Sequence, residues 1–225
     1  MFGYLRDIFR QKSTPVLLAG SLFSILLLLV RINATGRIFF LFMLWNLFLA
    51  FIPWFLGSII QVRKIKKRWV LLPFLLCWII FFPNAPYILT DLIHLKTDNG
   101  APLWYDLILL LSFGFTGLLY GFVSLKIISG LLEENLRKFW KNVIITGLIY
   151  ISSFGIYLGR FLRWNSWDII NNPGGLLRDI SVRLVDPFTY QSTWIFTLLY
   201  GTLMVILYWG FESFGKTEKM KADTE

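Results

Sequence analysis

The chain has 225 residues, of which 56% are hydrophobic and 16% are charged. A soluble domain is closer to half apolar and a quarter charged. Here the apolar residues come in uncharged runs of about 18 to 24 residues, long enough to cross a bilayer as helices. The formal net charge of +9 does not indicate nucleic-acid binding, because the basic residues lie in the connections between these runs. The composition therefore excludes a soluble protein and predicts an integral membrane protein.

The apolar runs predict an all-α fold, a polytopic membrane helix bundle with about six transmembrane helices and a single domain over 1–225. The first run follows a short basic segment, as in a signal peptide. No convincing small-x-small cleavage site follows it, so we expect it to remain as the first span. The predicted spans are about 15–30, 38–60, 69–89, 104–125, 142–159 and 194–211.

The basic residues predict the orientation of these spans. With six spans, both termini and alternate connections share one side of the membrane, and 15 of the 22 Lys and Arg residues lie on that side. The strongest cluster is 63–68. Because basic connections stay on the cytoplasmic side, both termini are predicted to be cytoplasmic.

Two prolines, Pro83 and Pro86, predict a break at the end of the third span, since proline removes a helical N–H. Non-helical backbone at membrane depth is tolerated where protein or a wet cavity satisfies it, so a polar pocket is expected here. If Pro86 begins a new α-helix, four polar side chains share an arc of about 100° on that helix. These side chains are Tyr87, Thr90, Asp91 and His94.

Asp91 and His94, the single histidine, form the sharpest local pattern. The carboxylate can orient a histidine base, or the two can share a metal if Asp106 or Asp168 supplies further ligands. The structural alternative, which is the more common role of such pairs, is that both bind a neighbouring arginine or the backbone at the membrane surface. Asn84 has a structural alternative of its own, since it can cap the helix that follows it.

The longest connection, 160–193, carries a second polar element at its start. Arg160 and Arg163 follow helical spacing with two tryptophans, so their guanidinium groups can stack on indole rings. Two arginines near a membrane surface can clamp a phosphate or a carboxylate. The alternative is that they anchor the end of the fifth span among lipid headgroups. Asn165 and Asp168 complete this element.

The same connection predicts an interfacial helix before the last span. Residues 172–175 are typical of a turn. After the turn, apolar and charged residues fall on opposite helical faces, which favours a helix that lies in the membrane interface and does not cross it. The apolar face is Leu176, Leu177, Ile180 and Leu184, and the polar face is Arg178, Asp179, Ser181, Arg183 and Asp186.

Other features of the sequence indicate packing and not chemistry. Gly114, Gly117 and Gly121 in the fourth span predict a face for close helix contact. The sequence contains no Walker loop, no dinucleotide glycine fingerprint, no Gly-x-Ser-x-Gly elbow and no His-Glu-x-x-His motif. No cofactor is therefore predicted, and no metal is assigned.

The stretch from Phe82 to Leu95, together with the later Gly159-Arg160-Phe161-Leu162-Arg163-Trp164-Asn165, resembles a family of bacterial multi-pass membrane proteins called domain of unknown function 1361. The similarity covers most of the chain, from the second span to the sixth. It implies a location in the bacterial inner membrane. It implies no reaction and no catalytic residues.

The two polar elements fall on the same predicted side of the membrane, which leads to a functional hypothesis. Asp91, His94, Arg160 and Arg163 line a polar pocket at the outer leaflet that binds an anionic headgroup or a lipid-linked substrate. In a catalytic version, His94 is the base, Asp91 orients it and the arginines hold the anion. Further candidates for substrate binding are Asn84, Tyr87, Thr90, Asn165 and Asp168.

Two alternatives remain open at this point. In the first, the protein is a non-catalytic accessory or structural membrane protein whose polar motifs stabilise the bundle. In the second, it is a small-solute transporter that uses the proline break as its site. The absence of charges in the middle of the spans makes the transporter the weakest of the three hypotheses.

Overall fold

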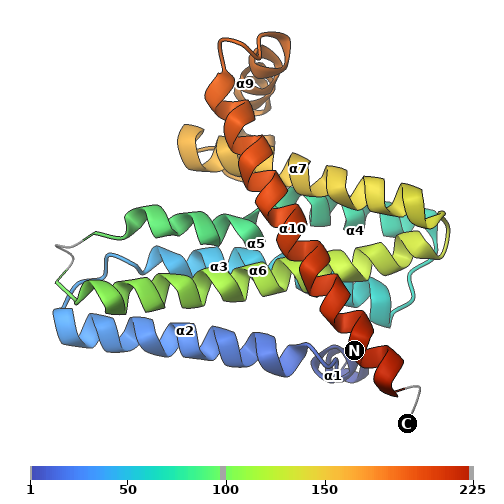
Figure 1. The fold of residues 1–225 in the computed structure, drawn as a ribbon, viewed down its shortest axis with the longest axis horizontal. Helices are drawn as coiled ribbons and strands as arrows, with labels where there is room; N and C mark the ends of the chain where they lie inside the picture. The colour runs from blue at the N-terminus through green and yellow to red at the C-terminus, as the bar shows by residue number, and fades with distance from the viewer. Residues whose placement is uncertain (1, 97–99, 223–225) are drawn as a thin grey trace. The chain divides into compact units, whose positions relative to one another are not determined.

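The computed structural model describes residues 2–96 and 100–222, and their side chains over 6–96 and 100–214. The described residues form helices joined by short connections, with no strand among them (Figure 1). In chain order the helices are α1 (Phe2–Phe9), α2 (Thr14–Thr35), α3 (Phe42–Val62), α4 (Arg68–Phe81), α5 (Asn84–Tyr87), η1 (Ile88–His94), α6 (Leu103–Glu133), α7 (Lys138–Leu162), α8 (Asp168–Asn171), α9 (Pro173–Val185) and α10 (Gln191–Ala222).

Six helical segments of the described chain are long and apolar enough to cross a membrane, which confirms the all-α, multi-pass prediction. They are Thr14–Thr35, Phe42–Val62, Arg68–His94, Leu103–Glu133, Lys138–Leu162 and Gln191–Phe214. Most of these helices extend beyond the predicted apolar runs, because a helix continues through polar residues until a cap or a turn ends it. The protein is therefore a multi-pass membrane protein built from helices.

The contacts divide the chain into two compact units, Met1–Ile128 and Ser129–Glu225. The boundary falls inside α6, so the first unit contains α1 to η1 and most of α6, and the second contains the end of α6 and the remaining helices. A single membrane domain over 1–225 stays a prediction.

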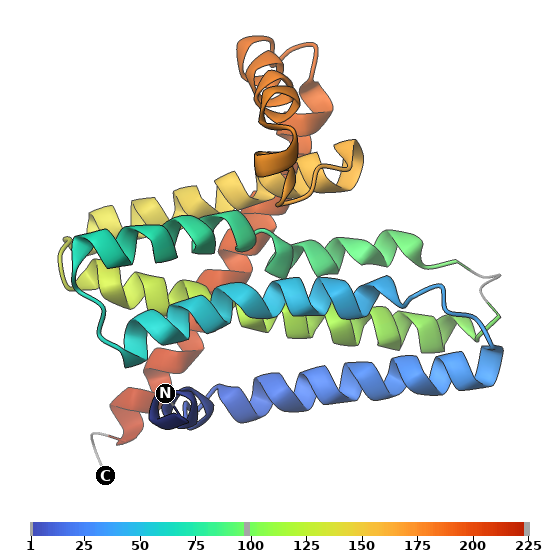
Figure 2. The same cartoon turned by 180° about the vertical axis from the view of Figure 1, so that it is seen from behind.

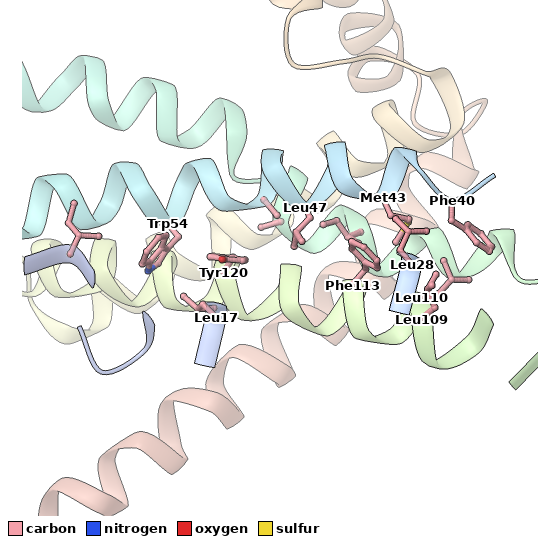
Figure 3. Close-up of a cluster of buried hydrophobic side chains, with 14 residues drawn as sticks. Leu17, Leu28, Phe40, Met43, Leu47, Trp54, Leu109, Leu110, Phe113 and Tyr120 are labelled. Atoms are coloured by element: carbon pink, nitrogen blue, oxygen red, sulfur yellow. The ribbon is translucent and has the colours of Figure 1, made fainter. Parts of the chain in front are cut away.

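The first unit is organised around α3 and α6. Both views show α3 and α6 crossing in the middle of this unit, with α2 on one side of them and the α4–η1 segment on the other (Figures 1 and 2). Buried apolar side chains along α3 and α6 form a cluster to which α2 contributes from one side (Figure 3). Members from these helices include Leu17, Leu28, Met43, Leu47, Trp54, Leu109, Phe113 and Tyr120.

The third span changes its backbone geometry towards its end. The α-helix α4 ends at Phe81, a turn covers Phe82 and Pro83, and α5 has only four residues. From Ile88 to His94 the chain is a 3₁₀ helix, η1, and not the α-helix expected to begin at Pro86. The side-chain amide of Asn84 donates to the Phe81 carbonyl at 2.9 Å, so this polar side chain serves the interrupted backbone.

The glycines of α6 allow this irregular segment to approach closely, which confirms the predicted packing face. A Cβ atom on Gly117 would lie 2.9 Å from the carbonyl oxygen of Ala85, and one on Gly121 would lie 3.1 Å from the Ala85 side chain. A Cβ atom on Gly114 would lie 3.3 Å from the Cα atom of Leu89. The position of α5 and η1 therefore depends on small residues at successive turns of α6.

In the second unit, α7 and α10 pack against each other. They meet closely at Gly201, where an added Cβ would lie 2.4 Å from the ring of Tyr150. The Tyr150 hydroxyl also lies 2.9 Å from the Thr202 hydroxyl, in hydrogen-bond contact. The Tyr150 ring therefore occupies the space that any side chain larger than glycine at position 201 would need.

Gly201→Ala is expected to destabilise the protein by about 1–3 kcal/mol, the usual cost of forcing extra volume into a packed contact. Gly210→Ala on the same helix is the matched control, because nothing lies within 4 Å of its added Cβ. There the better helix propensity of alanine is expected to leave stability unchanged or raise it slightly. Thermal unfolding of both variants in detergent measures the difference, and equal melting temperatures would contradict this account of the α7–α10 contact.

The predicted turn at 172–175 is wrong, because these residues begin a helix. Asn172 is the N-cap of α9, its side-chain oxygen accepts the Gly175 N–H at 3.1 Å, and Pro173 is the first helical residue. Proline at this position needs no N–H donor, and its fixed φ suits the first helical turn. The same Asn-Pro-Gly-Gly sequence that is typical of a turn thus caps the helix.

Candidate functional site

The first polar element is centred on Asp91 and His94 in η1. Because side chains three residues apart eclipse in a 3₁₀ helix, these two lie in one row, with the His94 Nε2 atom 4.0 Å from Asp91 Oδ1. The Asp91 side chain is 1% exposed, whereas the His94 side chain is 35% exposed. A buried carboxylate therefore lies behind an imidazole that remains accessible.

Side chains from α3 and the preceding connection hold this pair in place. Asn46 donates its side-chain N–H to Asp91 Oδ2 at 2.9 Å. The rings of Phe39 and Phe42 meet the His94 ring edge to face, at centroid distances of 6.3 and 5.4 Å. Sequence reasoning missed Asn46, since it lies 45 residues before Asp91 in an otherwise apolar span; an amide inside a span was the available signal.

Two other candidates on this segment, Asn84 and Thr90, bind backbone carbonyls. The Thr90 hydroxyl donates to the Tyr87 carbonyl at 2.7 Å, and Asn84 binds the Phe81 carbonyl as described above. Tyr87 lies in α5 and Thr90 in η1, so the four polar side chains do not form the single α-helical stripe that was expected. They form two rows, because a 3₁₀ helix turns by about 120° per residue.

A buried ion pair that the sequence analysis did not propose lies near the same end of the first unit. Arg31 of α2 donates from Nε to Asp106 Oδ1 at 2.7 Å and from Nη2 to Oδ2 at 3.1 Å. Both side chains are 0% exposed, and the Arg31 guanidinium lies 4.5 Å from the centre of the Phe40 ring. The bidentate pair engages both carboxylate oxygens of Asp106, which argues against Asp106 as a ligand of a metal shared with His94.

The second polar element, in the second unit, has a different geometry from the predicted one. The helix α7 ends at Leu162, so Arg160 lies in its last turn while Arg163 has left the helix. Arg163 has the left-handed conformation, with φ 64° and ψ 27°, at a position where glycine is the usual residue. Helical spacing therefore does not extend from Arg160 to the tryptophans beyond it.

Asn165 and Asp168 bind each other. The backbone N–H of Asn165 donates to Asp168 Oδ2 at 2.7 Å, and its side-chain amide donates to the same oxygen at 3.3 Å. This carboxylate closes the loop before α8, where Asp168 is the first residue. The contacts favour a structural role for both residues.

A cluster that the sequence analysis missed joins α9 to the neighbouring segments. Asp179 accepts the indole N–H of Trp164 at 2.8 Å, and its other oxygen lies 3.4 Å from Arg183 Nη1. The Arg183 guanidinium lies 4.8 Å from the centre of the Tyr190 ring, and Trp194 of α10 donates to the Arg183 carbonyl at 3.0 Å. The spacing of Asp179 and Arg183, i and i+4, was the available signal.

The described residues contain no group of three or more His, Cys, Asp or Glu side chains placed to hold a metal ion. An accessible imidazole beside a buried carboxylate can accept or donate a proton. An arginine held at a helix end can bind an anion.

Comparison with protein families matches residues 45–207 to the family described as "Protein of unknown function (DUF1361)". The matched range includes both polar elements and five of the six candidate spans in whole or in large part. The chain belongs to this family. The resemblance noted from the two motifs is thereby confirmed. No curated protein and no solved structure matches the chain.

Proposed function

We propose that this protein binds an anionic lipid headgroup, or the anionic group of a lipid-linked substrate, at the outer face of a bacterial cytoplasmic membrane. Asp91, His94, Arg160 and Arg163 are the residues assigned to this role. The observation that carries the proposal is the His94 imidazole, 35% exposed at the end of a membrane span, with the buried carboxylate of Asp91 behind it.

The placement on one side of the membrane follows from the order of the spans. Successive spans cross in opposite directions, so the connection after η1 and the connection after α7 emerge on the same side. The basic cluster at 63–68 is on the other side, which the positive-inside tendency assigns to the cytoplasm together with both termini. Arg160 and Arg163 thus lie on the side opposite the cytoplasm, where the positive-inside tendency does not account for arginine.

The residue types suit an anionic ligand. Arginine binds carboxylate and phosphate groups through two parallel N–H donors. His94, with Asp91 oriented by Asn46 behind it, adds a group that can hold or move a proton near the bound anion. In a catalytic version of the site, His94 is the base and Asp91 its positioning residue.

Arg163→Gly separates ligand binding from folding. Because Arg163 has φ 64°, glycine is expected to leave stability unchanged or raise it by about 1 kcal/mol while it removes the guanidinium. A hydrogen bond to a charged group contributes about 1.5–3 kcal/mol. Its loss is therefore expected to weaken binding of phosphatidylglycerol or a polyprenyl phosphate about tenfold or more. Native mass spectrometry measures this change, with phosphatidylcholine, which has no net charge, as the reference lipid.

Lys64→Gly is the matched control, since Lys64 is the other described non-glycine residue with positive φ and lies on the cytoplasmic side in this topology. It is expected to leave binding unchanged. His94→Gln, tested in the same way, is also expected to weaken binding. Unchanged binding by both Arg163→Gly and His94→Gln at equal protein level would refute the proposal.

A second candidate, a non-catalytic accessory protein, is favoured by one set of contacts. Asn84, Thr90, Asn165 and Asp168 each bind the backbone or a side chain within a few residues of themselves. In that case, substitutions of His94 and Asp91 lower the amount of folded protein and leave anionic-lipid binding per folded molecule unchanged.

A further inference from the structure

The exposed surface of α9 carries large apolar side chains beside the exposed polar residues Arg178 and Ser181. Arg183, assigned to the polar face, instead has a buried side chain whose guanidinium packs on the Tyr190 ring. Asp179, assigned to the same face, accepts the indole N–H of Trp164, and Trp194 donates to the backbone carbonyl of Arg183. The large apolar side chains that remain exposed are Leu177 (62%), Leu184 (58%), Val185 (84%) and, directly after the helix, Phe188 (82%). We call these four residues the α9 apolar stripe.

The inward contacts tie α9 to the ends of two membrane spans. Trp164 lies two residues after the last residue of α7, and Trp194 lies in the first turn of α10. Both donate hydrogen bonds to α9, and both views place α9 at the starting end of α10 (Figures 1 and 2). Tryptophan concentrates at the level where a bilayer meets water, so these contacts place α9 at that level.

The chain itself keeps α9 close to the bilayer. Five residues, 186–190, connect its last residue, Val185, to the first residue of α10, so these two helix ends lie at most roughly 22 Å apart along a fully extended chain. At the same end, hydrogen bonds from the side chain and the backbone N–H of Thr189 hold the pKa of the Asp186 carboxyl below its ordinary value. A charged carboxylate at this end of the helix favours headgroup level over deep insertion.

We infer that the α9 apolar stripe is seated in the outer leaflet of the bilayer that the six spans cross, at the boundary between headgroups and acyl chains. The helix lies along the surface, with its apolar stripe among lipids and its Asp179–Arg183 pair against the ends of α7 and α10. Such helices bind by burying an apolar face a few ångströms into this boundary. The inference concerns the lipid surface and is independent of the ligand proposed for His94 and Arg163.

Spin labels on the full-length protein in nanodiscs of phosphatidylethanolamine and phosphatidylglycerol test this inference. In a Cys77→Ser background, single cysteines replace Leu184, Val185 and Phe188. Leu22→Cys, on an exposed apolar position of α2, gives the lipid reference. Asn135→Cys, exposed in the connection between α6 and α7, gives the water reference.

The expected result is an oxygen-to-nickel accessibility ratio at the stripe several-fold above that at residue 135 and below that at residue 22, which lies well inside the span α2. A ratio equal to that at residue 135 would place the stripe in water and overturn the inference. Protection from both reagents would show that protein covers the stripe, from this chain or a second copy, and would overturn it as well. If a label within α9 lowers the melting temperature, Phe188→Cys, which lies beyond the helix, gives the reading.

Discussion

Arg31→Met is expected to lower the free energy of unfolding by about 3–5 kcal/mol, the usual cost of leaving one charge of a buried pair without its partner. Both side chains of the Arg31–Asp106 pair are 0% exposed, and two hydrogen bonds of 2.7 and 3.1 Å join them. Without the guanidinium, the buried Asp106 carboxylate is left without its partner charge and its two hydrogen-bond donors. Thermal or denaturant unfolding of the purified protein in detergent measures the loss.

The double variant Arg31→Met with Asp106→Leu distinguishes charge pairing from simple loss of packing. With both charges removed, stability is expected to recover most of the loss, because apolar side chains of similar size often replace a buried ion pair at little cost. Arg178→Met, at an exposed position of α9, is the control and is expected to change stability by less than about 0.5 kcal/mol. A double variant as unstable as the single one would show that the pair is not what stabilises this contact.

Gly117→Ala is the second substitution with a large expected effect, a destabilisation of about 1–3 kcal/mol. The added Cβ would lie 2.9 Å from the Ala85 carbonyl oxygen and 2.9 Å from Ile88 Cδ1. A side chain can move away from such a contact, but Ala85 contributes backbone, so α6 and α5 have to separate. Unfolding in detergent measures the stability, and anionic-lipid binding by the folded fraction measures the effect on the site.

Gly130→Ala on the same helix provides the matched control, since nothing lies within 4 Å of its added Cβ. There alanine is expected to be neutral or to add up to about 1 kcal/mol through helix propensity. Because η1 follows α5 directly, Gly117→Ala is also expected to displace His94 and to weaken lipid binding, whereas Gly130→Ala leaves it unchanged. If the two variants were equally stable, close approach at Gly117 would not position this segment.

The span pattern, the glycine face and the family were all accessible from the sequence. Each depends on local properties: the length of an uncharged apolar run, small residues spaced by helical turns on α6, and two unusual motifs. The tendency of Asp91 and His94 to lie in one row was also local, since residues three apart meet on both an α-helix and a 3₁₀ helix. These predictions needed no knowledge of which helices are neighbours.

Which residues pair across helices was decided by the tertiary structure alone. Arg31 and Asp106 are 75 residues apart, Asn46 and Asp91 are 45 apart, and nothing in either segment by itself selects the other as a partner. The α9 face differs from prediction for the same reason: amphipathic spacing separates apolar from polar residues, but Trp164 and Tyr190 supply partners for the side chains of its charged pair. A periodic pattern identifies the faces of a helix, and the neighbouring side chains determine which face turns to the protein and which to the membrane.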